Sequence, residues 1–279
     1  MTHEVFGIDH FDEKAVVAFL LLFGIAETLL GAYKNSRRTR HDYMTELVSF
    51  PQLTVLIQPG ILLIVIFTGR SLFPEMEEQF ASVAYGFQFL IFVLIEDLPQ
   101  YWWHRLAHHS PLLWKFHVAH HASPAMGVGV VFRNAAFYYL FMPNIWFASI
   151  AVFLGFGKVY IAYTVLKLLI IIGSHSELRW DSFLYRYKFL SPLAWLVEHT
   201  ISTPATHFAH HGISNEDGIS NNNGNFGNML FIWDQIFGTA KFTRKYPSQF
   251  GIENDPKDAW YVQLYYPFLK SKKEDSALK

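Results

Sequence analysis

Histidine is concentrated in two short segments of this chain. Residues 104–121 read HRLAHHSPLLWKFHVAHH, with six histidines in eighteen positions, and HFAHH follows at 207–211. His104 and His108 are four residues apart, so they share one face of a helix. The other two groups have i, i+3, i+4 spacing, and they are His117, His120 and His121, and His207, His210 and His211. Three such faces could surround one point, and neutral imidazole binds zinc, copper, iron and nickel.

Eight clustered histidines are more than one metal ion can use, because a catalytic zinc takes three protein ligands and a structural zinc takes four. The spacing therefore predicts a site for two ions. His175 directly follows the last apolar segment and is expected to be a ninth ligand. His109 and His199 are possible extra ligands, although His109 points about 100° away from His108 on a helix. The chain has no cysteine, which excludes disulfides, iron–sulfur clusters and thiol nucleophiles.

The composition is typical of a membrane protein. The chain is 52% hydrophobic and 16% charged, whereas soluble domains carry about 25% charged residues. Aromatic residues make up 18%, and Trp and Tyr concentrate at bilayer interfaces. The net charge of -1 gives no sign of a nucleic-acid partner. The acidic N-terminal start lacks the basic region of a secretory signal, so no cleaved signal is expected.

Five apolar segments are candidates for transmembrane helices, which need about 20 residues to cross a bilayer. They are residues 15–33, 53–69, 80–95, 135–157 and 159–174. The last two could instead form a tight hairpin that crosses only partly. Charges inside such segments are costly and often functional. Glu27 lies in the first segment, and Lys167 in the last is expected to snorkel toward the interface.

The charge pattern places all the clustered histidines on one side of the membrane. A basic loop at 34–43 follows the first segment, which marks the cytoplasmic side. Counting crossings from this loop puts His104, His175 and everything beyond at the cytoplasmic face. The aromatic, apolar and basic segment 182–196 is expected to lie on the membrane surface. The predicted fold is all-α, with four to five polytopic membrane spans and a cytoplasmic helical cap that holds a histidine-rich dimetal site.

The order H-x3-H, H-x2-H-H, single His, H-x2-H-H resembles the fatty acid hydroxylase/sterol desaturase family of integral-membrane di-iron oxygenases. DLPQYWWHRLAHH is similar to the family's lead-in to the first histidine box, and STPATHFAHHG is similar to its last box. NNNGNFGNMLFIWDQIFGT resembles the family's Asn/Gly loop, which precedes Trp-Asp and Phe-Gly-Thr. The resemblance covers about residues 80–245.

This resemblance implies two iron ions, O2 as co-substrate and a lipid substrate from the bilayer, with zinc able to replace iron in preparations. The implied metal ligands are His104, His108, His117, His120, His121, His175, His207, His210 and His211. It also implies an external electron-transfer protein of the reductase, ferredoxin or cytochrome b5 type. Oxidising an unactivated C–H bond needs a cofactor, because no side chain is a strong enough oxidant. Hydroxylation is favoured over desaturation, since the tail resembles the glyceryl-ether monooxygenase branch more.

Three polar residues are candidates for supporting roles. Asp97 lies seven residues before His104 and could accept a hydrogen bond from a ligand imidazole, or be an ordinary interfacial charge. Asp234 could do the same for the last histidine box, or cap a turn. Asn225 could contact the metals through water.

The predicted organisation has three parts. Residues 1–79 form an N-terminal membrane region with two spans, 80–245 the histidine-box catalytic domain, and 246–279 a C-terminal tail. A bacterial inner membrane is favoured over the endoplasmic reticulum, because the chain ends without a dilysine retrieval signal. Two rival functions stay open. A histidine-rich divalent-metal transporter should hold its ligands near mid-membrane, and a zinc-dependent membrane hydrolase needs a general base such as the glutamate of HExxH, which the sequence lacks.

Overall fold

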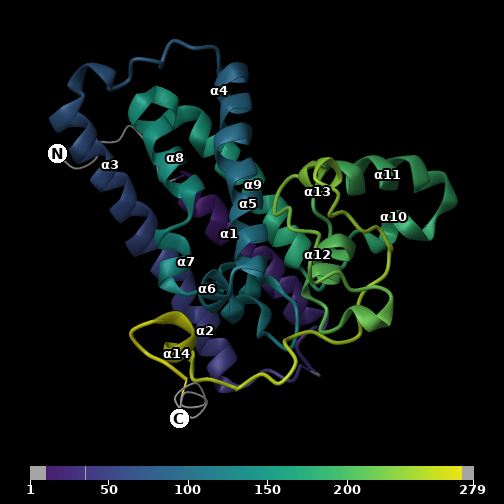
Figure 1. The fold of residues 1–279 in the computed structure, drawn as a ribbon. Coiled ribbons are helices and arrows are strands. Elements are labelled where there is room, and N and C mark those ends of the chain that lie inside the picture. The colour runs from purple at the N-terminus through teal and green to yellow at the C-terminus, as the bar shows by residue number, and fades with distance from the viewer. Residues whose placement is uncertain (1–10, 35, 272–279) are drawn as a thin grey trace.

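The protein is all-helical in the computed structural model, which describes residues 11–34 and 36–271 (Figure 1). Within these residues there is no β-strand, and two isolated β-bridges join Ile201 to Leu230 and Gly212 to Phe250. The predicted all-α class is therefore confirmed. The acidic N-terminal start and the end of the expected C-terminal tail lie outside the described residues.

Long helical runs form one part of the molecule, and most continue through a π-helical turn. The runs are α1 (Phe11–Leu29), α2 (Arg40–Pro51) with α3 (Gln58–Leu72), α4 (Tyr85–Phe92) with α5 (Leu98–His109), and α8 (Pro143–Ala151) with α9 (Gly157–His175). α9 packs against α1 and α4, and α3 packs against α8. The bundle therefore supplies two helices, α5 and α9, that each end in histidine.

Two of these runs are long and apolar enough to span a membrane, at residues 40–72 and 143–175. In the most apolar window of the first run, only 11% of the residues are buried inside the protein. A helix in the core of a soluble protein buries such a surface, whereas lipid solvates it. These exposed apolar helices indicate a membrane protein. The expected first segment ends earlier than predicted, since α1 ends at Leu29 rather than at Tyr33.

The expected fourth and fifth segments form a bent helical pair. Gly155 has a φ of 108°, which breaks the helix between α8 and α9. A Cβ at this position would lie 2.7 Å from the backbone nitrogen of Ala81, so the close approach requires glycine. The fourth segment begins at Pro143 rather than at residue 135, because the preceding residues form the separate short helix α7 (Ala136–Leu140). The third likewise begins later than predicted, at Tyr85.

Lys167 does not snorkel to an interface, which corrects the expectation from the sequence. Its side chain is buried, and its Nζ donates to Glu96 Oε1. The same carboxylate accepts hydrogen bonds from Asn144 Nδ2 at 2.8 Å and from the hydroxyl of Tyr163 at 2.7 Å. This buried cluster joins the run that leads into α5 to both α8 and α9. A buried charge persists when it is paired and hydrogen-bonded in this way.

Lys167→Met is expected to destabilise the protein by about 3–5 kcal/mol, because it leaves the Glu96 carboxylate buried without its cation. The Glu96→Gln/Lys167→Met double variant should recover much of that loss. Lys158→Met, at an exposed lysine of the same helix, is the matched control and should be neutral. Thermal unfolding in detergent measures all three. Equal effects at 158 and 167 would contradict the assigned role of the pair.

Shorter helices form the rest of the molecule and gather beside the long runs (Figure 1). They are α6 (Pro111–His121), α7, α10 (Ser182–Arg186), α11 (Ser191–Thr200), α12 (Pro204–His211), α13 (Ile232–Ile236) and α14 (Trp260–Leu264). α6 packs against α5, and α12 packs against α9. Each of the four helices that end in a histidine motif therefore packs against another of the four. α14, in the expected C-terminal tail, packs against α2 and α6.

Candidate metal centre

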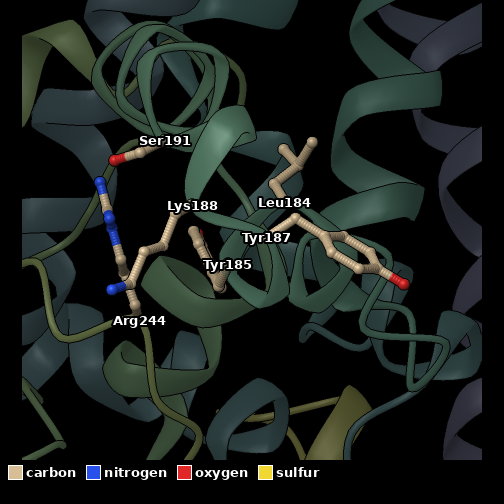
Figure 2. Close-up of a pocket in the computed structure, with 6 residues that line it drawn as sticks. All are labelled: Leu184, Tyr185, Tyr187, Lys188, Ser191 and Arg244. Carbon is tan, nitrogen blue, oxygen red and sulfur yellow. The ribbon is translucent and has the colours of Figure 1, made fainter.

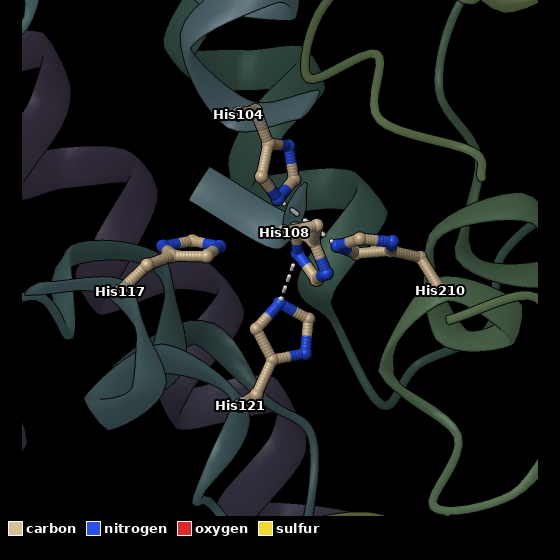
Figure 3. A group of neighbouring side chains, drawn as sticks. All are labelled: His104, His108, His117, His121 and His210. Atoms are coloured by element: carbon tan, nitrogen blue, oxygen red, sulfur yellow. Dashed lines mark hydrogen bonds between the residues drawn. The ribbon is translucent and has the colours of Figure 1, made fainter. Parts of the chain in front are cut away.

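The nine clustered histidines converge from four helices into two adjacent groups. The five-histidine group contains His104, His108, His117, His121 and His210, and the four-histidine group contains His120, His175, His207 and His211. Within each group, the ring nitrogens that could bind metal all lie within 4.8 Å of one another. Figure 3 shows the five rings of the first group pointing toward a common centre. The structure thus offers one site for each of two ions.

Each H-x2-H-H motif contributes to both groups. In α6, His117 and His121 enter the five-histidine group and His120 enters the other. In α12 the pattern is reversed, since His207 and His211 enter the four-histidine group and His210 enters the five-histidine group. The two groups touch directly: the rings of His121 and His211 stack with centroids 4.4 Å apart. In each helix, therefore, the i and i+4 histidines enter one group, and the i+3 histidine enters the other group.

Local capping sets where the two histidine helices begin. The Ser110 hydroxyl accepts from the backbone nitrogen of Leu113 at the start of α6. A capping box between Thr203 and Thr206 begins α12, and Asp181 Oδ2 accepts from the backbone nitrogen of Ala205 at 2.7 Å. Such caps satisfy free N–H groups in the first turn of a helix. They hold the register that puts the three histidines of each motif on the inner side.

Most of the rings are held through Nδ1 by a neighbouring oxygen. The Nδ1 partners are Phe226 O for His104 (2.8 Å), Asn134 Oδ1 for His117 (2.7 Å), Val130 O for His120 (3.1 Å), Ile171 O for His175 (2.8 Å) and Gly224 O for His210 (2.8 Å). A carbonyl oxygen only accepts, so Nδ1 carries the proton and donates. The Nε2 lone pair is then free for a metal, which is the arrangement seen at metal-binding histidines.

The inward-facing Nε2 atoms are arranged for a cation. His104 Nε2 and His210 Nε2 are 3.0 Å apart, yet both rings already use their proton at Nδ1. Two lone pairs therefore face each other with no proton between them, and a shared metal ion would relieve the repulsion. His117 Nε2 is buried and has no hydrogen-bond partner among the described residues. In the other group, His207 Nε2 lies 2.9 Å from His175 Nε2 and 3.1 Å from His211 Nε2. The donor set fits two bound metal ions.

Burial keeps these imidazoles neutral. Loss of water lowers the pKa of His104 to about 4. Burial first, and neighbouring imidazoles second, also hold the pKa of His121 and His211 well below the ordinary value. A metal ligand must be unprotonated, so at neutral pH the rings are in their metal-binding form. Aromatic rings complete the enclosure, since Tyr138 stacks on His117 with centroids 4.7 Å apart and Trp114 lies 5.1 Å from His108.

The Asn/Gly loop supplies backbone oxygens rather than side-chain ligands. Asn225, expected to contact the metals through water, instead donates to Thr206 O at 2.8 Å and accepts from the backbone nitrogen of Lys241 at 2.7 Å. Its backbone is left-handed, with a φ of 56°, a conformation that asparagine tolerates better than most residues. Asn225 thus shapes the loop that presents the carbonyls of Gly224 and Phe226.

The two aspartates support this loop and do not contact an imidazole directly. Asp234 accepts from the backbone nitrogens of Phe226 (2.8 Å) and Gly227 (2.7 Å), so its link to His104 runs through the loop. Asp97 accepts from Trp233 Nε1 at 2.7 Å and from the backbone nitrogen of Leu230 at 3.2 Å. The carboxylate of Asp97 thus holds the segment after the loop, and among the described residues its hydrogen bonds do not include a ligand ring.

Asp234→Ala is expected to weaken metal retention about 10–100-fold, the usual cost of losing an outer partner of a ligand. Asp217→Ala is a matched control, since Asp217 also accepts from two backbone nitrogens and one hydroxyl, but in the exposed part of the same loop. Competition with a chelator measures the retention of metal by each purified variant. A similar loss from both variants would indicate general loosening of the loop.

Both of the suggested extra ligands lie outside the two groups. His109 is exposed at the end of α5, with its ring centroid 6.2 Å from that of Phe226. His199 stacks between Trp195 and Phe242 and donates from Nδ1 to Trp195 O at 2.8 Å. His109 is rotated about 100° from His108 around the helix, so its side chain points away from the centre.

Two supporting side chains were not identified as such from the sequence. Asn134 holds His117, but it lies in a loop and no spacing rule connects the two. Glu27 was noted only as a charge in an apolar segment. Its carboxylate accepts from the backbone nitrogens of Val128 (3.2 Å) and Glu177 (2.9 Å), from Ser176 Oγ (2.8 Å) and from a tyrosine hydroxyl. Val128 lies two residues before Val130, whose carbonyl holds His120, and Ser176 directly follows His175. Both histidines belong to the four-histidine group.

The chain is similar to known lipid-modifying enzymes. It is 30% identical over 175 residues to the alkylglycerol monooxygenase of Danio rerio, which covers 62% of this chain and 35% of that protein. It is 30% identical to the Homo sapiens alkylglycerol monooxygenase, over 51% of this chain and 28% of that protein. It is 26% identical to the ornithine lipid hydroxylase OlsE of Rhizobium tropici, over 68% and 53% of the two chains.

The aligned parts span between 28% and 53% of these relatives, and no solved structure matches the chain. The family model described as fatty acid hydroxylase matches residues 89–239. That range is more than half of the 279 residues and contains all nine clustered histidines. The resemblance expected from the histidine motifs is confirmed, and the chain belongs to the fatty acid hydroxylase family.

Proposed function

We propose that this protein is a membrane-bound oxygenase that hydroxylates a C–H bond of a lipid. One atom of O2 enters the new alcohol and the other leaves as water, so each turnover takes two electrons and two protons. An external electron-transfer protein, of the reductase, ferredoxin or cytochrome b5 type, would supply the electrons. The proposal rests on the pair of adjacent all-histidine groups. Their inward ring nitrogens lie close together, with the lone pairs of His104 Nε2 and His210 Nε2 facing each other.

The nine histidines would hold two iron ions, five ligands for one and four for the other. Bound iron would supply, together with O2, the oxidising power toward a C–H bond that no side chain has. The protein's own contribution is to keep the rings neutral by burial and to orient them through Nδ1. Five imidazoles on one ion exceed the four ligands of tetrahedral zinc, which favours iron. Zinc would still occupy such a site in some preparations.

The proposed substrate is a lipid that reaches the centre from the bilayer. The names of the relatives specify an alkylglycerol and an ornithine lipid, and both name oxygen insertion rather than desaturation. In this chain, Tyr138 and Trp114 pack beside the histidines, and aromatic side chains suit a hydrocarbon chain better than a polar substrate. Hydroxylation is accordingly proposed over desaturation.

The proposed topology has four to five spans, with both histidine groups at the cytoplasmic face of a bacterial inner membrane. It is supported by the basic loop at 34–43 and by the position of the histidines, which stand at the C-terminal ends of α5 and α9. The proposed organisation is a membrane region at 1–79, a catalytic domain at 80–245 and a tail at 246–279. A transporter would hold its ligands within broken helices at mid-membrane. The position of the histidines at the ends of helices therefore argues against a transporter.

The test is metal analysis followed by turnover on one preparation. Protein purified in mild detergent from iron-replete cells should contain about two irons per chain, one for each histidine group. Supplied with a reducing system, it should place one atom of ¹⁸O2 in a hydroxylated lipid extracted with the protein. A preparation with both irons that consumes no O2 in the presence of its native lipids would contradict the proposal. Metal flux into vesicles without O2 consumption would favour the transporter instead.

A further inference from the structure

The short helices beside the metal centre expose an unusual apolar face. We define this interfacial face by Phe183, Phe189, Leu193, Trp195, Leu196 and Ile236, whose side chains are between 46% and 77% exposed. They come from α10, residues 188–190, α11 and α13. Single apolar residues are common on a protein surface, but six of them on short elements that pack against one another mark contact with a partner or a membrane. None of these residues belongs to the long apolar runs.

α11 is amphipathic in the direction opposite to that of a water-facing helix. Its inner side carries Ala194, which is fully buried, and Glu198, which is bonded to Arg244 through three short contacts. Its outer side carries Leu193 and Leu196. In water the polar groups would face outward and the apolar groups inward. The ion pair on the inside fixes the helix in an orientation that displays leucine to its surroundings.

Positive charge accompanies the apolar residues. Residues 182–196 contain Arg186 and Lys188 and no acidic residue. A pocket of about 380 Å³ opens beside them, lined by Leu184, Tyr185, Tyr187, Lys188, Ser191 and Arg244. Figure 2 shows Lys188 and Arg244 on the same side of this pocket. Since Arg244 is paired with Glu198, Lys188 is the cation available at the pocket for an anionic group. Basic residues interleaved with large apolar side chains are the mark of helices that lie on anionic bilayers.

The direction of α11 agrees with this reading. In Figure 1, α11 runs across the direction of α4 instead of along it. If the long runs cross the bilayer, α11 lies close to the membrane plane. α11 also leads, through residues 201–203, into α12, which carries three histidines of the metal centre.

We propose that α10, residues 188–190 and α11 lie in the membrane interface, with the interfacial face among the acyl chains and Lys188 at the phosphates of anionic lipids. This anchor holds α12, and with it both histidine groups, at a defined depth where lipid can enter. The inference requires the membrane location of the long runs, and it is independent of the oxidation chemistry.

The absence of cysteine makes depth measurement direct, because each introduced cysteine carries the only nitroxide label. Phe189→Cys and Leu196→Cys report on the interfacial face. Phe67→Cys, exposed on α3, is the control for lipid, and Glu216→Cys, exposed in the Asn/Gly loop, is the control for water. The full chain is placed in nanodiscs of phosphatidylcholine with phosphatidylglycerol. Collision with O2 is compared with collision with Ni(II)-EDDA at each position.

Labels at 189 and 196 are expected to favour O2 over Ni(II)-EDDA, as at 67, and the label at 216 to favour the nickel complex. Labels at 189 and 196 that behave like the label at 216 would overturn the proposal and leave the face as a docking surface for a protein. If the label at 67 also favours Ni(II)-EDDA over O2, the assignment of the long runs to the membrane fails. This readout needs no turnover, so it separates the anchor from the proposed oxygenase activity.

A second comparison tests the anionic lipid. Omitting phosphatidylglycerol should shift the label at 189 measurably toward water, and Lys188→Glu should remove this dependence. Adding inorganic phosphate to nanodiscs of pure phosphatidylcholine should not restore the depth. The same depth in both lipid compositions would overturn the role given to Lys188, and restoration by free phosphate would assign the pocket to a soluble anion. Retained metal content verifies that each variant is folded.

Discussion

His210→Ala is expected to reduce bound metal from about two ions to about one per chain and to lower the proposed lipid hydroxylation by at least about 100-fold, since losing only an outer partner of a ligand already costs 10–100-fold. His210 supplies one of the two lone pairs that face each other 3.0 Å apart in the five-histidine group. His207→Ala should remove the other ion, because His207 is the four-histidine member close to both His175 and His211. The double variant should retain neither.

The chain offers a sharp control for this result. His108 and His109 are neighbours in the sequence, but only His108 belongs to a group, whereas His109 is exposed. His108→Ala should therefore lower metal content, and His109→Ala should leave metal content and turnover unchanged. Metal per chain is measured by mass spectrometry on the purified variants, and turnover on the same samples. An equal loss in the two variants would contradict the assignment of two groups.

The sequence predicts which histidines belong together better than it predicts how they are divided. The i, i+3, i+4 spacing indicates that three rings share a side of each helix, and the structure brings all nine to one place. The division of α6 and α12 between the two groups depends on how these helices pack against α5 and α9. It also depends on how these two pairs of helices meet, and His104 and His210 lie 106 positions apart, so no local spacing encodes it.

The supporting contacts were less predictable for a different reason. His104, His120 and His210 are held by backbone carbonyls, which every residue possesses and which leave no trace in the sequence. Asp97 and Asp234 were noticed as carboxylates near the motifs, but their partners are backbone groups of a loop. In these cases the sequence showed the chemical type of the residue, but it did not show which group the residue would bond.

The fold shows the same limit. Apolar runs correctly predicted helices, but a run does not distinguish a membrane span from a buried cap segment. Residues 136–140 form α7, which packs on α6, while the long apolar helical run begins only at Pro143. Lys167 was interpreted as a solitary charge because its partner, Glu96, lies 71 positions away.

Glu27→Ala is expected to loosen the four-histidine group selectively. Glu27 is fully buried on α1, outside the region matched by the family model. Its carboxylate joins two segments: Val128, two residues before the carbonyl that holds His120, and the turn at Ser176 that directly follows His175. Removing it leaves several buried donors without an acceptor, at about 1–3 kcal/mol each. Metal affinity of this group should fall about 10–100-fold, as for other partners that orient ligands.

Single-site backgrounds separate this effect from general destabilisation. His210→Ala leaves an ion in the four-histidine group, and there Glu27→Ala should speed metal loss to a chelator. His207→Ala leaves an ion in the five-histidine group, and there Glu27→Ala should change the release rate little. The exposed Glu216→Ala is neutral in both backgrounds by the same reasoning. Equal acceleration in the two backgrounds would mean that Glu27 supports the fold as a whole. Acceleration in the first alone would mean that a carboxylate from the N-terminal helix positions one of the two metal sites.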